Sequence, residues 1–160
     1  MRSRGFDDLD ADDLVAFRIH GVRPAFIREM ADAGYPNLSG DQLIAFRIHR
    51  INASFMDEMK AMGLTNLTPK QALGLRIWRI DADFRDEMRD LGMANFTPER
   101  LIAMKMLDLD ARLIRELREQ RFEDVSIRRL LRDRGHDWNW NDHNREYIDA
   151  VEDIVRELTQ

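Results

Sequence analysis

Apolar, small and basic positions recur along the chain with a fixed period. A five-residue pattern, seen first as Ala16-Phe17-Arg18-Ile19-His20, returns every 29 residues. Its copies begin at Ala16, Ala45, Gly74 and Ala103. These four full units are preceded by a half copy from Phe6 and followed by a last half copy that decays after Leu131. Self-similarity at such a period is typical of proteins built from one repeated supersecondary element.

Start and stop signals predict two helices in each unit. The first helix begins after an N-cap residue at Asp10, Ser39, Thr68, Thr97 and Ser126, with proline at the first helical position in Pro69 and Pro98. Ser39 with Gln42 and Thr68 with Gln71 form predicted capping boxes. The second helix begins after Asn52, Asp81 and Asp110 and ends before Gly34, Gly63 and Gly92, since glycine takes the left-handed conformation at low cost.

The apolar residues of the two helices differ in how far they extend around the helix. In the second helix, Phe55, Met56, Met59 and Met62 lie on one stripe, which indicates a helix with one face on a core and one in water. The first helix carries apolar residues around more of its circumference, as at Leu43, Ile44, Phe46, Ile48 and Ile51. We therefore expect the first helix to be the more buried one, packed between the preceding and the following units.

This pattern predicts the fold class. We expect an all-α chain, a right-handed-type α-solenoid of helix-pair repeats with about nine repeat helices and a non-repeat C-terminal capping helix. The expected organisation is a single domain over residues 1–160, with repeats at 6–131, a linker at 132–143 and the capping helix at 144–160. The last helix is expected from apolar residues at helical spacing between Tyr147 and Leu158.

Composition and charge narrow the function. The 160 residues are 44% hydrophobic and 34% charged, as in an ordered helical protein, and the net charge of −5 disfavours binding to nucleic acid. Cysteine is absent, and no apolar run is long enough to predict membrane insertion. The start of the chain does not resemble a secretory signal, so the chain as written is expected in the cytoplasm, or in the periplasm if it is excised from an envelope protein.

One basic position interrupts the apolar stripe of every first helix. It is occupied by Arg18, Arg47, Arg76 and Lys105. The second helix carries a carboxylate at a fixed position, in Glu29, Glu58, Glu87 and Glu116. A covered guanidinium needs a carboxylate partner, so these residues predict a structural ladder of ion pairs along the repeats. The alternative is a row of arginines that grips acidic ligands.

Methionine also recurs at one repeat position, as Met30, Met59 and Met88. Plain core packing is the expected role. The alternative is a partner-binding layer, because methionine-rich surfaces adapt to partner helices.

The segment 135–143 lies outside the repeat and brings together His136, Asp137, Asp142 and His143. Two imidazoles and two carboxylates have the chemistry to hold a divalent cation, but their spacing matches no metal motif, and helix capping accounts for Asp142. We therefore expect neither a metal nor a cofactor. No HExxH, phosphate loop or nucleophile elbow is present, and we expect no enzymatic activity.

The unit beginning Ala16-Phe17-Arg18-Ile19-His20, with Arg28-Glu29-Met30 further on, resembles a bacterial tandem helical repeat of the same period. That repeat occurs in C-terminal regions of BlaR/MecR-like sensor metallopeptidases and related envelope or regulatory proteins. The resemblance spans about residues 6–131 and implies a sensory or protein-interaction module. No catalytic residue is carried over, because the zinc motif of the peptidases belongs to another domain.

These observations favour a protein- or peptide-binding repeat scaffold as the function. One alternative is a metal- or ligand-responsive regulator that uses the 135–143 linker. A further alternative is an engineered or structural repeat scaffold without a natural ligand.

Overall fold

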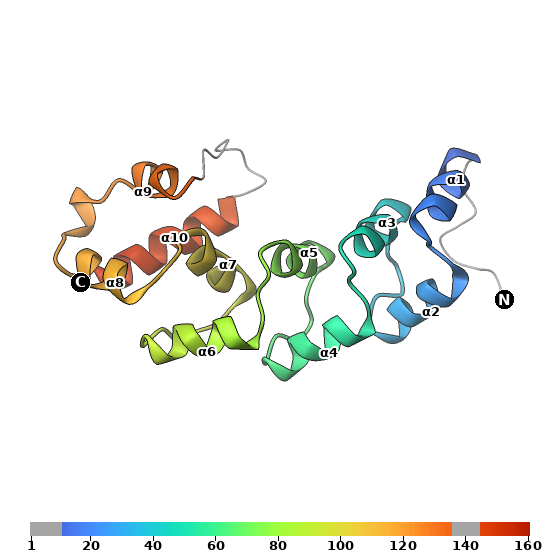
Figure 1. The fold of residues 1–160 in the computed structure, drawn as a ribbon, viewed down its shortest axis with the longest axis horizontal. Coiled ribbons are helices and arrows are strands. Elements are labelled where there is room, and N and C mark those ends of the chain that lie inside the picture. Colours follow the sequence, from blue (N-terminus) through green and yellow to red (C-terminus); the bar gives the residue numbers. More distant parts are fainter. Residues whose placement is uncertain (1–10, 136–144) are drawn as a thin grey trace. The chain divides into compact units, whose positions relative to one another are not determined.

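The computed structural model describes residues 11–135 and 145–160. These residues form ten α-helices and one short 3-10 helix and contain no strand, which confirms the predicted all-α class (Figure 1). The chain divides between Ile77 and Trp78 into two compact units, and each is described by itself below.

The helices alternate between the two types that the sequence predicts. The first helices are α1 (Ala11–His20), α3 (Gly40–Ile48), α5 (Pro69–Ile77), α7 (Pro98–Met106) and α9 (Ile127–Asp133). The second helices are α2 (Pro24–Asp32), α4 (Ala53–Ala61), α6 (Ala82–Asp90) and α8 (Ala111–Arg118). From α2 to α9, helices of the same type begin 29 residues apart. The 3-10 helix η1 (Phe122–Asp124) precedes α9, and α10 (Arg145–Leu158) is the predicted C-terminal helix.

Side-chain caps hold the N-terminal ends of the helices as predicted. Ser39 and Gln42 form a reciprocal capping box, and Thr68 and Gln71 form a second one. At the second helices, the Oδ1 atoms of Asn52, Asp81 and Asp110 accept the backbone N–H three residues further on. The hydrogen bond from Leu113 lowers the pKa of Asp110. The predicted cap Asp10 lies outside the described residues.

Each second helix of the first three units ends in a Schellman motif centred on the predicted glycine. Gly34, Gly63 and Gly92 have φ values of 105°, 82° and 88°. The next residue donates its N–H to the carbonyl of the repeat methionine five residues earlier, over 2.8 to 3.0 Å. The sequence signal for these helix ends is therefore confirmed.

The first helices also end in a Schellman-type turn, but the left-handed position is not always a glycine. Gly21 occupies the left-handed position after α1, but Arg50 follows α3 with φ 55° and Asp108 follows α7 with φ 48°. The N–H groups of Ile51 and Leu109 close the motif on the carbonyls of Phe46 and Met104. The Cβ of any residue other than glycine opposes this conformation, so the motif persists here at some cost in stability.

In the N-terminal unit, the first helices pack on one another in sequence order. α3 contacts α1 and α5. Figure 1 shows α1, α3 and α5 along one side of this unit and α2 and α4 along the other. The core between them contains phenylalanine and methionine from the second helices and phenylalanine and leucine from the first. Its most buried members include Phe26, Met30, Leu43, Phe46, Phe55 and Met59.

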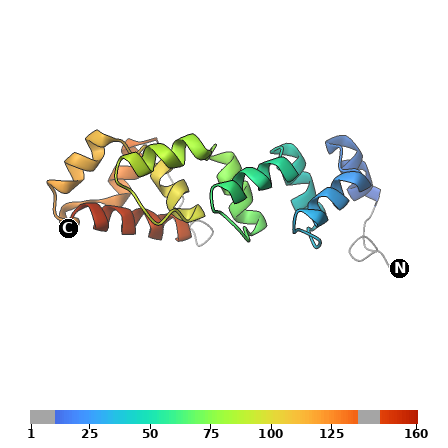
Figure 2. The same ribbon diagram turned by 90° about the horizontal axis from the view of Figure 1, so that it is seen from below.

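In the C-terminal unit, α10 packs against α7 and, less extensively, α8 (Figure 2). Its buried face consists of Tyr147, Ile148, Ala150, Val151, Ile154, Val155 and Leu158. On α7, every residue from Leu101 to Met104 is buried, and so are the last residue of the helix, Met106, and the residue that follows it, Leu107. α7 is therefore enclosed on all sides, as expected of a helix that is apolar around its circumference.

The two kinds of helix end predict stability changes of opposite sign. Gly63→Ala places a Cβ in the left-handed conformation and should lower the free energy of unfolding by about 1 kcal/mol. Arg50→Gly relieves the same conformation and should raise that free energy by about 0.5 kcal/mol, after the greater freedom of glycine in the unfolded chain is counted. Urea unfolding followed by circular dichroism measures both. Shifts in the same direction would contradict the assignment of strain to this position.

Candidate functional site

Three of the four repeated cations of the first helices lie over phenylalanine rings. The guanidinium carbon of Arg47 is 4.9 Å from the ring centroid of Phe26, and that of Arg76 is 5.3 Å from the centroid of Phe55. The Nζ atom of Lys105 is 4.4 Å from the ring centroid of Phe84. In all three pairs the ring belongs to the preceding second helix and lies 21 residues earlier in the sequence. Repeat symmetry therefore produces a series of cation–π contacts.

Two further contacts position these guanidinium groups. The Nε atom of Arg76 donates a hydrogen bond of 3.0 Å to the backbone carbonyl of His49, at the end of α3. The Arg47 side chain passes close to Gly21, where an added Cβ would lie 3.3 Å from a guanidinium nitrogen. Arg47 and Arg76 thus link α3 and α5 to the end of the first helix that precedes each of them.

The structure does not bring these cations together with the repeated glutamates. Among the ion pairs of the described residues, none joins Arg18, Arg47, Arg76 or Lys105 to Glu29, Glu58, Glu87 or Glu116. Glu29 instead accepts the N–H of Ala53 through Oε1 over 3.0 Å, at the start of α4. Glu116 lies 3.7 Å from Arg112 on its own helix. The predicted Arg–Glu ladder is therefore replaced by cation–π contacts. Arg18 and Arg47 are exposed and Arg76 and Lys105 are only partly covered, so none of these cations requires a buried carboxylate.

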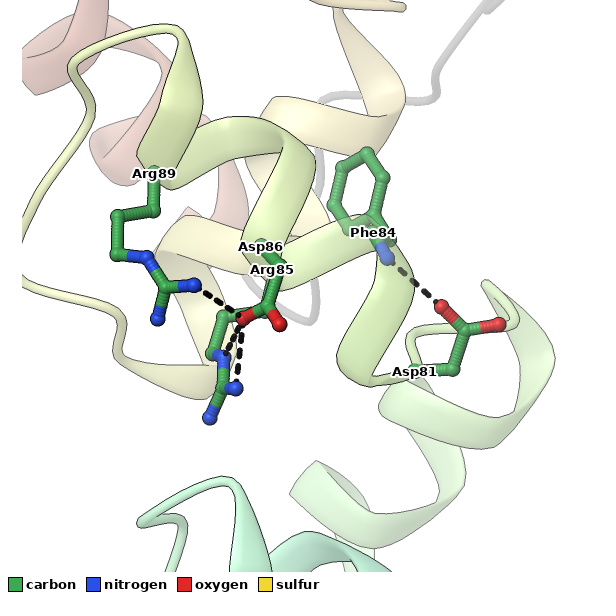
Figure 3. A network of polar contacts seen from close by, with 5 residues as sticks. All are labelled: Asp81, Phe84, Arg85, Asp86 and Arg89. Carbon is green, nitrogen blue, oxygen red and sulfur yellow. Dashed lines mark hydrogen bonds and ion pairs between the residues drawn. The ribbon is translucent and has the colours of Figure 1, made fainter.

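Charged residues of the second helices pair within their own helix. On α6, Asp86 Oδ1 lies 2.6 Å from Arg85 and 3.2 Å from Arg89, while Asp81 caps the helix through the Phe84 N–H (Figure 3). The Arg85 side chain is 20% exposed, and those of Asp86 and Arg89 are 42% and 57% exposed, so the Arg89–Asp86 pair in particular contributes little to stability.

The repeated methionines lie in the core and offer no surface to a partner. Met30, Met59 and Met88 are each at most 1% exposed. The alternative role as partner-binding residues is therefore wrong, and core packing is the correct prediction. Their backbone carbonyls are also the acceptors of the Schellman motifs.

The candidate binding site is instead formed by a row of exposed apolar side chains on the first helices. Ile19, Ile48 and Ile77 occupy one repeat position on α1, α3 and α5, and are 72%, 55% and 56% exposed. We call these three residues the isoleucine row. Sequence reasoning missed it, because Ile48 was expected to be buried with the rest of its helix. The sequence did contain a signal for this row. The apolar residues of the first helix extend around more of its circumference than the adjacent helices can bury, so some of them must be exposed.

The predicted metal ligands His136, Asp137, Asp142 and His143 lie outside the described residues. Within residues 11–135 and 145–160, no three His, Cys, Asp or Glu side chains are grouped in a way that would hold a metal ion. None of the helices in this part of the chain has the length and apolar character needed to cross a membrane.

Polar contacts fix α10 to the rest of the C-terminal unit. Arg100 of α7 donates to Glu157 over 2.8 Å, and the guanidinium carbon of Arg156 lies 4.4 Å from the ring centroid of Phe122. Tyr147 is buried in this interface. Burial, together with the nearby charges of Glu146 and Glu99, raises the pKa of Tyr147 to about 12.

Comparison with known proteins gives no relative from which a role can be transferred. No family model, no curated protein and no solved structure matches this chain.

The cation–π contacts predict a specific coupling between Arg76 and Phe55. In a double-mutant cycle with Arg76→Gln and Phe55→Leu, we expect a coupling of about 0.5 to 1 kcal/mol in the free energy of unfolding. Glu58→Gln combined with Arg76→Gln should show no coupling. A coupling between Arg76 and Glu58 as large as that between Arg76 and Phe55 would contradict this assignment and support the predicted ion pairs.

The shifted pKa of Tyr147 predicts loss of stability in alkali. The folded state holds the phenolic proton more tightly than the unfolded state, whose tyrosine titrates near pH 10. The stabilisation is therefore complete below pH 10 and is lost as the pH rises toward 12. Unfolding in urea at pH 9 to 12 should show a steeper decline in the wild type than in Tyr147→Phe, by up to about 2 kcal/mol. Parallel pH profiles would contradict the prediction.

Proposed function

We propose that this protein is a non-enzymatic repeat scaffold that binds a segment of a partner protein along the isoleucine row. The observation that carries the proposal is that Ile19, Ile48 and Ile77 are exposed at the same repeat position on helices that pack in succession. Singly scattered apolar residues are normal on a surface, whereas a continuous apolar patch is typical of an interaction site.

The energetics agree with this role. Covering an isoleucine side chain completely contributes roughly 1.5 to 3 kcal/mol. Burying the exposed parts of these three therefore contributes about 3 to 5 kcal/mol, so flanking contacts must add to the row for a stable complex. Because the three residues lie on three helices held by their own core, the row is formed before the partner binds. Little ordering of the scaffold is then required on binding.

Two further features support a finer description. Helices of the same type begin 29 residues apart, and α3 packs against both α1 and α5. These features favour an α-solenoid, in which the length of the binding surface follows the number of repeats. The resemblance to a repeat of bacterial sensor proteins favours a sensory or regulatory role for this module.

A display library of random 16-residue peptides tests the proposal. Peptides are selected on the wild-type protein and then measured by fluorescence anisotropy against Ile19→Asp/Ile48→Asp/Ile77→Asp. We expect the affinity of the selected peptides to fall at least about tenfold in this variant, because charge on the row opposes burial.

Leu14→Asp is the matched control. Leu14 is 58% exposed on α1, and it lies about 140° around the helix from Ile19 at 100° per residue. Its substitution should leave the affinity unchanged, and circular dichroism should show both variants folded. A library that yields no binder, or binders indifferent to the triple variant, would contradict the proposal and favour a scaffold without a ligand.

A further inference from the structure

In one repeat, the residue equivalent to those of the isoleucine row is buried within the protein. Met106 of α7 occupies the repeat position of Ile19, Ile48 and Ile77, yet it is 0% exposed. Ile102, one turn earlier, is also completely buried, whereas its counterpart Val15 on α1 is 57% exposed. The first helix of the fourth repeat, α7, therefore buries the face that α1, the first helix of the first repeat, leaves exposed.

The element packed most extensively against α7 is α10. It is an amphipathic helix of 14 residues whose buried face is formed mainly by branched aliphatic residues, including Ile148, Val151, Ile154 and Val155. The Arg100–Glu157 contact of 2.8 Å fixes it at the edge of the interface. α10 is therefore the principal neighbour of the helix that carries the buried equivalents of the row.

The spacing of the helices also suits a helical occupant. Packed helices lie about 8 to 10 Å apart. Two turns of an α-helix, or seven residues, rise about 10.5 Å. A helix lying across α1, α3 and α5 would therefore present residues i, i+7 and i+14 to the three isoleucines in turn.

Charge at the edge of the row favours an acidic flank on that helix. An arginine directly precedes each isoleucine in the sequence, and Arg18 and Arg47 are exposed. α10 has the complementary character, with Glu146, Asp149, Glu152, Asp153 and Glu157 against two arginines.

From these observations we infer that the isoleucine row binds an amphipathic α-helix of a partner protein, with branched aliphatic residues at i, i+7 and i+14 and an acidic flank, in the way that α7 binds α10. The inference rests on the proposed function and specifies the conformation and chemistry of the occupant.

The test uses the full chain and two synthetic peptides. The helical probe has the sequence of residues 145–158, extended by one further heptad of the same pattern. An i,i+4 hydrocarbon staple at the exposed positions of Arg145 and Asp149 holds it helical and leaves the other four acidic residues in place. The control peptide has proline in place of Glu152 and no staple, so that it keeps every residue of the apolar face but not the helix. Binding is measured by fluorescence anisotropy.

We expect the stapled peptide to bind the wild type, and its affinity to fall at least about tenfold in Ile48→Asp and in Ile77→Asp but not in Leu14→Asp. The proline peptide should bind at least about tenfold more weakly than the stapled one. Stapled-peptide binding that is insensitive to Ile48→Asp would mean that the probe displaces α10 from α7, and would overturn the inference.

Other occupants give other results. Equal binding of the two peptides through the row would overturn the helical occupant while leaving the proposed function intact. A wild-type dimer in sedimentation velocity that becomes a monomer in Ile48→Asp would assign the row to self-association. Sedimentation with phosphatidylglycerol vesicles that is lost in the same variant would assign it to a lipid surface. Either of these last two outcomes also overturns the inference.

Discussion

The shortness of the helices is the constraint on which the structure depends. From α2 to α7 each helix has only nine residues, and isolated helices of that length are not stable in water. Side chains cap the N-terminal ends of α3 to α7, whereas Arg23, the N-cap residue of α2, makes no such hydrogen bond. Each helix persists because its apolar face lies against other helices. Phe26 and Met30 in α2 illustrate this, since both side chains are buried and the Met30 carbonyl also closes the end of the helix. Local and tertiary stabilisation therefore act through the same residues.

Features encoded by neighbouring residues were predictable from the sequence. Ser39 with Gln42, the aspartates before α6 and α8, and Gly63 and Gly92 all act within a few residues of themselves, so spacing alone specified their hydrogen bonds. The left-handed backbone conformation of Arg50 and Asp108 was missed, because neither residue type indicates that conformation in the way that glycine does. The tertiary geometry of the turn imposes it against their preference.

Features that depend on the relative placement of helices were harder to predict. The basic residue of each first helix was correctly identified as a repeated cation that needs a partner, but spacing does not tell a glutamate from an aromatic ring on the neighbouring helix. Phe26 and Glu29 lie only three residues apart on α2. The structure uses the ring for Arg47 and the carboxylate as a cap for α4. Burial was misjudged in the same way, since Ile48 and Phe46 are both apolar and only the fold determines which one is covered.

The enclosure of α7 by α10 has a consequence for how the protein can change in length. The contacts that hold α10 come from α7 and α8, both within the C-terminal unit, and they involve residues such as Arg100 that depart from the repeat. Duplication or deletion of an internal 29-residue copy would leave this closure intact. The exposed row could therefore lengthen or shorten by whole repeats without redesign of the chain's end.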